Sequence, residues 1–307
     1  MASKKLRKPV FLKETSSAKL HLEQMKKINP DSLNFEVRSK LNHDIKTVTL
    51  GIVGEDAIVY ELKNSHMPLY VLHDLLLEYD GYFAQIDFLV ITRKINFVIE
   101  CKNLFGNIEI NSKGDFIRSF DNGEQEGIYS PITQNQRHLE IIRQICRETK
   151  GNALMRTAYD KLFPSFFRSV VVLANEKTIL NDSNAKKEIK EQVIRADSLV
   201  SYIKEQEKKS DSLGLNDQQM EESANFFLKR HVERNIDYLL EYEKTTELVD
   251  KKQHDISAFG STTNVRECPQ CGASMVVRTN KKGGTMNFGK QFLGCADYPK
   301  CKHSMDL

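Results

Sequence analysis

The sequence predicts an α/β protein built on a mixed β-sheet, and three observations lead to this fold class. Three strand-like runs lie between residues 69 and 103, separated by the turn signals YDG and TRK: LYVLHDLLL, YFAQIDFLVIT and INFVIECKN. A helix-like segment follows at 131–149, with Ser130 as its N-cap and proline at its first position. The short apolar run SVVVLA then predicts a buried strand. Because a last strand reached through a helix is typical of a crossover connection, we expect a mixed sheet flanked by helices.

The remaining elements are predicted in chain order around this core. The chain begins with a basic arm and a polar helix, SSAKLHLEQMKKI, which ends at Asn29-Pro30. A second helix is predicted at 47–64, before the first strand, and a short hairpin at 106–120. The core order is therefore α-β-β-β-α-β. We expect four segments: an arm and helix at 1–44, the α/β domain at 45–180, a charged helical extension and linker at 181–255, and a small domain at 264–307.

Composition narrows the class of protein. Of the 307 residues, 40% are hydrophobic and 28% charged, as in ordinary soluble proteins. Every apolar run is far shorter than the roughly 18 residues that a membrane span needs. No apolar stretch follows the basic N-terminus, so we expect a cytoplasmic location without membrane association. The net charge is +3, and from Asp255 onward seven Lys or Arg stand against four Asp or Glu. The positive excess therefore lies in the tail, where a polyanion would bind.

Two carboxylates and a lysine are predicted to share one patch of the sheet. Strand alternation places Glu100 and Lys102 on one face. If the TRKI turn sets Thr92 opposite Ile95, Asp87 lies opposite Glu100. Paired carboxylates supply hard oxygen ligands to Mg²⁺ or Mn²⁺, and a neighbouring lysine can orient an attacking water and stabilise developing charge. The chemistry that needs this set is metal-assisted phosphodiester hydrolysis.

Two further polar residues fall on helix faces that are expected to be buried. Glu55 lies at helical spacing with Ile58 and Leu62, and Gln134 shares its face with His138 and apolar residues of the crossover helix. A buried polar group needs a partner or a purpose. Both side chains are therefore candidates for the same site.

The pattern G-x-x-G-E, Q-I-D, E-x-K and a downstream Gln resembles the nuclease-related domain (NERD), a branch of the PD-(D/E)xK nucleases with a restriction-endonuclease-like core. The resemblance covers roughly residues 45 to 180, and the order α-β-β-β-α-β is that superfamily's core. It implies that Asp87 and Glu100 bind Mg²⁺ or Mn²⁺, that Lys102 is catalytic, and that Glu55 and Gln134 support the site. The residues that carry it are Gly51, Gly54, Glu55, Gln85, Ile86, Asp87, Glu100, Lys102 and Gln134.

The resemblance also implies a further ligand, the backbone carbonyl of Cys101. The proline that names the wider motif is replaced here by Ile86. Taken alone, an E-x-K tripeptide is more often a salt bridge on a half-exposed sheet. Four spaced elements in the right order favour the nuclease fold, but a fold can persist without its activity.

The last 40 residues contain two close cysteine pairs, in CPQCG and CADYPKC. This spacing predicts a tetrahedral zinc site formed by Cys268, Cys271, Cys295 and Cys301, with His303 as an alternative to the last thiolate. A purely structural zinc is the simplest interpretation, since so short a segment cannot build a sufficient core unaided.

The same tail resembles the zinc ribbon in the C-terminal region of bacterial type IA topoisomerases, over about residues 264–307. C-P-x-C-G is followed there by G-K-x-F-L-G-C-x-x-Y-P-x-C, which implies binding to nucleic acid, above all to single-stranded DNA. Independently of this, aromatic residues alternate with cations, as in platforms on which bases stack. The alternative is that the aromatic side chains pack on the hairpin. The predicted contact residues are Arg278, Lys281, Lys282, Phe288, Lys290, Phe292 and Tyr298, with Lys300 beside them.

Two functional hypotheses follow. The first is a metal-dependent DNA nuclease that its zinc ribbon brings to DNA. The second is a non-catalytic nucleic-acid-binding or regulatory protein on an inactive nuclease fold. The intact set Asp87, Glu100 and Lys102 favours the first. RNA stays open as a substrate because nothing in either segment reads the 2′-hydroxyl.

Overall fold

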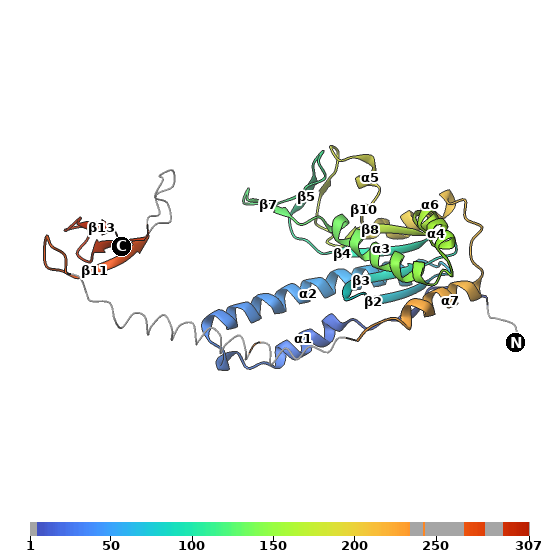
Figure 1. The fold of residues 1–307 in the computed structure, drawn as a ribbon, viewed down its shortest axis with the longest axis horizontal. Coiled ribbons are helices and arrows are strands. Elements are labelled where there is room, and N and C mark those ends of the chain that lie inside the picture. The colour runs from blue at the N-terminus through green and yellow to red at the C-terminus, as the bar shows by residue number, and fades with distance from the viewer. Residues whose placement is uncertain (1–4, 234–241, 243–266, 280–290, 307) are drawn as a thin grey trace. The chain divides into compact units, whose positions relative to one another are not determined.

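The structure is a computed structural model that describes residues 5–233, 242, 267–279 and 291–306. The chain divides into two compact units, Met1–Tyr242 and Glu243–Leu307, and each is described by itself (Figure 1). The end of the extension and linker expected at 181–255, from residue 243 onward, lies outside the described residues. Among the helices described, none is both long and apolar enough to cross a membrane.

A six-stranded mixed sheet forms the centre of the N-terminal unit and confirms the predicted fold class. Strands β2, β3 and β4 are antiparallel, whereas β1 pairs parallel to β2, β4 to β8, and β8 to β10. The strands follow the order β1-β2-β3-β4-β8-β10 across the sheet. Their bounds are Val10–Lys13, Tyr70–Tyr79, Tyr82–Ile91, Asn96–Lys102, Phe167–Leu173 and Val193–Arg195.

Helices cover both faces of this sheet. One face packs on α3 (Pro131–Glu148), α4 (Ala153–Phe166) and α7 (Asp217–Leu228), which bury side chains such as Ile142, Phe163 and Phe227. The other packs on α2 (Phe35–Lys63) and α6 (Leu199–Lys209). Shorter elements are α1 (Ser17–Lys27), α5 (Lys187–Lys190) and the 3₁₀ turns Pro30–Ser32 and Ala196–Ser198.

A small second sheet lies beside the main one. Its order is β7-β6-β5-β9, and the hairpin predicted at 106–120 is present as β5 and β6. The bounds are Asn107–Ile110, Phe116–Ser119, Gln125–Ile128 and Leu180–Asn181 for β5, β6, β7 and β9.

Helix α2 has 29 residues and begins earlier than the predicted 47–64. Asn34 caps it, accepting a hydrogen bond from the backbone N–H of Val37 at 3.0 Å. At Gly54 the helix backbone lies against β4, because a Cβ there would be 2.7 Å from Asn103 Cβ and 3.1 Å from Cys101 Sγ. The glycine thus lets α2 approach the strand that carries Glu100 and Lys102.

Two segments are built differently from the sequence prediction. The basic arm contains β1, which extends the main sheet. The stretch after residue 181 was expected to be helical, but Val193–Arg195 forms β10, where β-branched Val193 and Ile194 pair with β8. Helix α7 is part of the core rather than an extension, since Met220 and Ala224 are fully buried.

The C-terminal unit contains three short antiparallel strands in the order β11-β12-β13. They span Met275–Thr279, Gln291–Cys295 and Ser304–Asp306. Its buried cluster consists of Met275 and three of the four cysteines.

Candidate functional site

Strands β2 and β3 lose their regular alternation at Asp74 and Asp87. The ladder pairs residues on both sides of this position but not these two with each other, and Asp74 has a left-handed φ of 56°. Ile86 and Leu89 pack in one hydrophobic cluster although they are three residues apart. In a regular strand such residues point to opposite faces. The break turns Asp87 out of the regular pattern of β3.

Asp87 is held in line with the sheet by a backbone group of β4. The register of β3 and β4 is the predicted one, with Phe88 opposite Ile99, and the pairing ends there. Beyond it, Asp87 Oδ2 accepts a hydrogen bond at 2.7 Å from the backbone N–H of Cys101. The carboxylate therefore takes the place that a carbonyl of β3 would have in the ladder.

Glu100, Lys102 and Gln134 are in direct contact. Glu100 is 2% exposed, and its Oε1 lies 2.7 Å from Lys102 Nζ. The same ammonium donates to Gln134 Oε1 at 3.2 Å. Gln134 reaches it from the first turns of α3, which Ser130 caps. The lysine is thus fixed between a strand carboxylate and a helix amide.

The other oxygen of Glu100 is buried without a hydrogen-bond partner in the described part of the chain. His138 Nδ1 lies 3.7 Å away and has none either. Burial, together with the charge of Lys102, lowers the pKa of His138 to about 4, so its ring is neutral at pH 7. The pair leaves Glu100 Oε2 available to a ligand.

Burial raises the pKa of both carboxylates at this centre. For Asp87 the pKa is raised well above its ordinary value by burial, with the charges of Glu100 and Glu55 adding to the effect. For Glu100 burial is again the largest cause, and Lys102 opposes it. Among the described residues no cationic side chain forms an ion pair with Asp87, and the charge of Lys102 only partly offsets the rise in its pKa.

Glu55 lies near this group but contacts other residues. It is close enough to raise the pKa of Asp87, yet its Oε2 accepts from Ser16 Oγ at 3.0 Å and lies 2.9 Å from His73 Nε2. The sequence carried no motif that would assign Ser16 or His73 a role. The structure therefore brings Asp87, Glu100, Lys102 and Gln134 together and places Glu55 at their border.

The donor set at Asp87 and Glu100 fits a hard divalent cation. Each carboxylate has one oxygen engaged by the protein and one without a recorded hydrogen bond. Within the described residues, however, the four cysteines are the only compact group of three or more potential side-chain ligands. A cation at the two carboxylates would complete its shell with water, phosphate or a backbone carbonyl, as Mg²⁺ commonly does.

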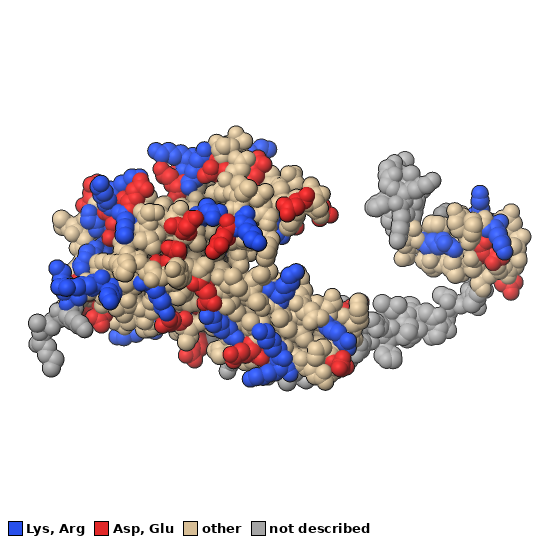
Figure 2. All heavy atoms as spheres, turned by 180° about the vertical axis from the view of Figure 1, so that it is seen from behind, with Lys and Arg blue, Asp and Glu red and all other residues tan. Residues whose placement is uncertain are grey.

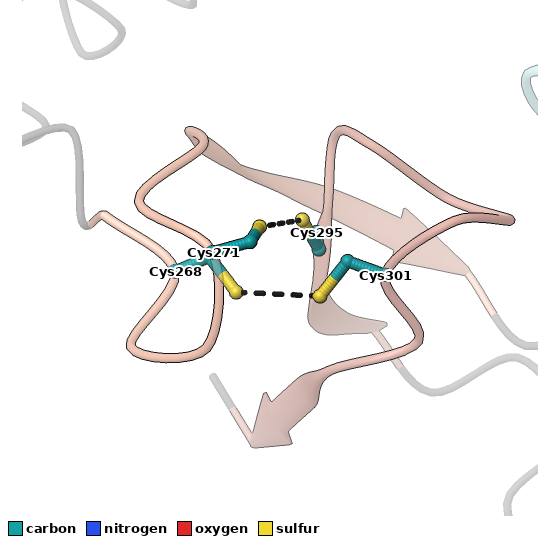
Figure 3. A group of neighbouring side chains, drawn as sticks. All are labelled: Cys268, Cys271, Cys295 and Cys301. Atoms are coloured by element: carbon teal, nitrogen blue, oxygen red, sulfur yellow. Dashed lines mark hydrogen bonds between the residues drawn. The ribbon is translucent and has the colours of Figure 1, made fainter.

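The four cysteines of the tail point toward one another (Figure 3). Cys268 Sγ lies 3.7 Å from Cys301 Sγ, Cys271 Sγ lies 3.4 Å from Cys295 Sγ, and all four atoms lie within 4.8 Å of one another. Zn–S bonds of about 2.3 Å in a tetrahedron give similar separations. His303, the alternative ligand, is not part of the cluster. The thiolate set supports a zinc ion.

Backbone geometry prepares the first cysteine for this role. Cys268 O accepts from the backbone N–H of Gly272 at 2.8 Å, and Gly272 takes the left-handed φ of 77° that closes the turn. Burial raises the pKa of the Cys268 thiol, but hydrogen bonds from the backbone N–H groups of Gln270 and Cys271 and from the thiols of Cys271 and Cys301 together outweigh it and lower the pKa to about 7. The turn thus favours the thiolate that binds metal.

One face of the ribbon carries a cation between aromatic rings. Arg278 lies opposite Phe292 in the ladder, and its guanidinium stands 5.5 Å from the ring centroid of Tyr298. Tyr298 is 59% exposed. The other predicted contact residues lie outside the described part of the chain: Lys281, Lys282, Phe288 and Lys290.

Comparisons with known proteins match two parts of the chain. Residues 50–174 match the nuclease-related domain family, and residues 265–307 match the topoisomerase DNA binding C4 zinc finger family. No solved structure matches the chain.

Curated relatives match only short stretches. DNA topoisomerase 1 of Archaeoglobus fulgidus is 42% identical over 43 residues, 14% of this chain and 6% of that protein. DNA topoisomerase 1 of Mycoplasma genitalium is 44% identical over 39 residues, 13% of this chain and 5% of that protein. The uncharacterized protein YrdD of Escherichia coli is 40% identical over 51 residues, 17% of this chain and 24% of that protein. This chain thus spans at most about a quarter of each relative. By these two matches, the chain contains a segment similar to the nuclease-related domain family and a second one similar to the C4 zinc ribbons of topoisomerases.

Proposed function

We propose that this protein is a metal-dependent DNA nuclease whose zinc ribbon holds the DNA. The observation that carries the proposal is Asp87, a carboxylate that forms no ion pair within the described residues, beside a buried Glu100 whose second oxygen has no hydrogen-bond partner there either. Two such groups are costly to bury unless a cation joins them. The nuclease-related family match supports the same interpretation.

Each residue then has a distinct role. Asp87 Oδ1 and Glu100 Oε2 would hold a Mg²⁺ or Mn²⁺ ion, which supplies Lewis-acid activation of water and phosphate. Lys102 orients the attacking water and offsets negative charge that develops on the phosphate oxygens. Gln134 keeps the lysine ammonium in place through its 3.2 Å hydrogen bond. Asp87 and Glu100 therefore bind, whereas Lys102 acts on the reaction itself.

The ribbon supports the DNA-binding part of the proposal. On the face of the N-terminal unit shown in Figure 2, basic and acidic side chains are interspersed rather than gathered by sign. The chain's positive excess lies in the tail, where Arg278 and the exposed ring of Tyr298 offer a cation and a stacking surface. Such a platform suits single-stranded DNA.

Cleavage assays on the purified full chain test the proposal. Labelled single-stranded DNA, double-stranded DNA and RNA would each be incubated with Mg²⁺, Mn²⁺ or EDTA. We expect metal-dependent cleavage of DNA that Asp87→Ala, Glu100→Ala and Lys102→Ala each abolish. The first two variants should also bind Mn²⁺ more weakly in calorimetry, whereas Lys102→Ala should bind it nearly normally, because an ammonium is no ligand.

Lys209→Ala is the matched control, because this exposed lysine forms its ion pair with Glu205 on the surface of α6. It should cleave like the wild type. If the wild type binds neither ion at millimolar concentration and cleaves nothing, the enzyme hypothesis is wrong and the non-catalytic one replaces it. Cleavage of RNA alone would change the substrate, and full activity of Lys102→Ala would contradict the mechanism.

A further inference from the structure

The short segment that runs from the last residue of β1 to the N-cap of α1, residues 13–16, lies against the candidate nuclease site. It precedes the region 50–174 that matches the nuclease-related family. Because β1 runs parallel to β2, its end arrives beside Leu72, one residue before His73. Lys13 Nζ donates to the backbone carbonyl of His73 at 3.0 Å and lies 3.7 Å from the Asp74 carboxylate. The segment is thus attached to β2 where the ladder of the sheet is broken.

Ser16 is placed as a helix cap but does not act as one. It is the N-cap residue of α1, yet its hydroxyl makes no capping hydrogen bond. The hydroxyl donates instead to Glu55 Oε2 at 3.0 Å. The backbone N–H at the start of α1 donates to the Asp74 carboxylate. An N-cap serine normally accepts from the helix backbone, so here its hydroxyl is committed to Glu55.

Both ring nitrogens of His73 contact acceptor oxygens. Nδ1 lies 3.1 Å from the carbonyl oxygen of Glu14, which can only accept, so Nδ1 donates there. Nε2 lies 2.9 Å from Glu55 Oε2, the oxygen that also accepts from Ser16 Oγ. His73 and Ser16 therefore contact the same carboxylate oxygen of Glu55.

The histidine itself has little freedom to move. It is 1% exposed, and its ring is stacked on Phe88 with the centroids 4.4 Å apart. Phe88 directly follows Asp87 in β3. The position of Glu55 relative to Asp87 is therefore fixed from one side by a stacked ring and from the other by a serine hydroxyl.

We propose, on the basis of the nuclease function above, that His73 and Ser16 are positioning residues for Glu55 and make residues 13–16 an integral part of the site. Through these two contacts the Glu55 carboxylate is held at the border of the acidic centre. Held in place, it strengthens the attraction of the centre for a divalent cation. Released, it turns toward solvent, and the segment 13–16 loses its attachment to α2.

The first test needs neither metal nor activity. Amide hydrogen exchange of the metal-free full chain would be compared for wild type, Ser16→Ala, His73→Gln and Glu55→Ala. We expect faster exchange over residues 10–27 in all three variants, because each removes one end of the same link. Ser17→Ala is the matched control, since its hydroxyl has no recorded contact in the described part of the chain. His66→Gln, an exposed histidine, is the second control.

The second test measures Mn²⁺ affinity by calorimetry. Ser16→Ala and His73→Gln should each weaken Mn²⁺ binding, but by less than Asp87→Ala does, because Glu55 borders the two ligands and does not itself bind the ion. Ser16→Thr keeps a hydroxyl and should restore the wild-type affinity. Rescue by threonine distinguishes a positioning role from loss of helix α1, and circular dichroism of each variant checks that it is folded.

Two outcomes of the hydrogen-exchange experiment would overturn the proposal. Exchange over residues 10–27 could be unchanged in the three variants, or it could be accelerated equally in Ser17→Ala. Unchanged Mn²⁺ affinity in both Ser16→Ala and His73→Gln would overturn the proposal too, provided that the wild type binds the ion. If the wild type binds no Mn²⁺ while exchange responds as expected, the link between the segment and Glu55 stands and the nuclease function fails.

Discussion

The two candidate sites of this chain are built in opposite ways. The thiolate cluster takes all its ligands from two turns between residues 268 and 301, and the cysteines make up most of the buried cluster around it. The acidic centre takes its residues from α2, β3, β4 and α3, in a unit with large hydrophobic clusters of its own. The fold of the ribbon therefore depends on the residues of its metal site, whereas the N-terminal unit has a hydrophobic core that does not need the acidic centre.

The largest effect expected from this difference is loss of the zinc site. Cys268→Ser should release the metal and unfold the C-terminal unit, because structural zinc contributes about 10–16 kcal/mol in small domains. The N-terminal unit should keep its far-UV circular dichroism and its unfolding transition. Elemental analysis of the wild type should give one zinc per chain.

Cys146→Ser serves as the control, because Cys146 belongs to α3 and contacts the main core. It should keep its zinc. Well under one zinc in the intact wild type would contradict the assignment of the cluster. Unfolding of both units in Cys268→Ser would contradict their independence.

A smaller effect is expected where the main fold does touch its site, at Gly54. Alanine favours a helix by about 1 kcal/mol over glycine. At Gly54, however, the new Cβ would lie 2.7 Å from Asn103 Cβ and 3.1 Å from Cys101 Sγ. Overpacking of this kind costs roughly 1–3 kcal/mol. Urea unfolding should show a net loss of stability, and cleavage should fall because α2 carries Glu55.

Gly51 provides the matched comparison one turn earlier in α2. A Cβ there meets nothing within 4 Å. Gly51→Ala should therefore stabilise the protein by roughly 0.5–1 kcal/mol, with cleavage unchanged. If both substitutions stabilised the protein, or both destabilised it, α2 would not lie as close to β4 as the structure places it.

On the ribbon, a surface change should affect binding and leave the fold intact. Tyr298→Ala removes an exposed ring that Arg278 covers on one side. Stacking of a base on an aromatic side chain is worth roughly 1–3 kcal/mol, so affinity for single-stranded DNA should fall about tenfold. Val277→Ala, also exposed, changes a residue next to Arg278 whose side chain points to the other face of the strand. If both variants bind like the wild type, the aromatic face does not contact DNA.

Sequence patterns predicted most of the elements that are locally encoded. The strands β2, β3, β4 and β8 and the helix α3 follow from apolar runs, turns and a cap, and the cysteine spacing brought four thiols together as expected. The β3–β4 register followed from the TRKI turn. In each case the signal lies within a few residues of the structure that it predicts.

The parts that were missed depend on contacts between distant segments. Strands β1 and β10 are only four and three residues long, and they exist because an edge of the sheet is available to them. The departure of Asp87 from the strand pattern depends on an interruption of β2 and β3 at the same position. The hydroxyl of Ser16 donates to a residue of α2, a helix that begins 19 residues later. The periodicity of apolar residues along the sequence does not predict contacts of this kind. The catalytic roles of Lys102, Glu55 and Gln134 stay predictions.

The last prediction concerns how the stability of the protein depends on pH, because Asp87 and the zinc ribbon should change this stability in opposite directions. Burial raises the pKa of Asp87 above the ordinary value of 3.8. Between that value and the raised one, the folded protein binds more protons than the unfolded chain. Stability from this group is therefore fully present below pH 3.8 and is lost as the pH rises through the folded pKa. At the zinc ribbon the sign is reversed, because protons compete with zinc for the thiolates.

Asp87→Asn tests this difference, because it removes the charge and keeps an oxygen for the backbone N–H of Cys101. At pH 7 the variant should resist urea better than the wild type, by on the order of 1 kcal/mol. The difference in stability between the variant and the wild type should become smaller as the pH falls toward 4. Millimolar Mn²⁺ should stabilise the wild type but not the variant, because the ion relieves the same charge that the substitution removes. Glu100→Gln should gain less stability at pH 7, because it removes the negative charge that lies 2.7 Å from Lys102 Nζ. A difference between Asp87→Asn and the wild type that stays constant with pH would mean that the charge of Asp87 is already compensated within the fold. The carboxylate would then no longer be the feature that calls for a cation.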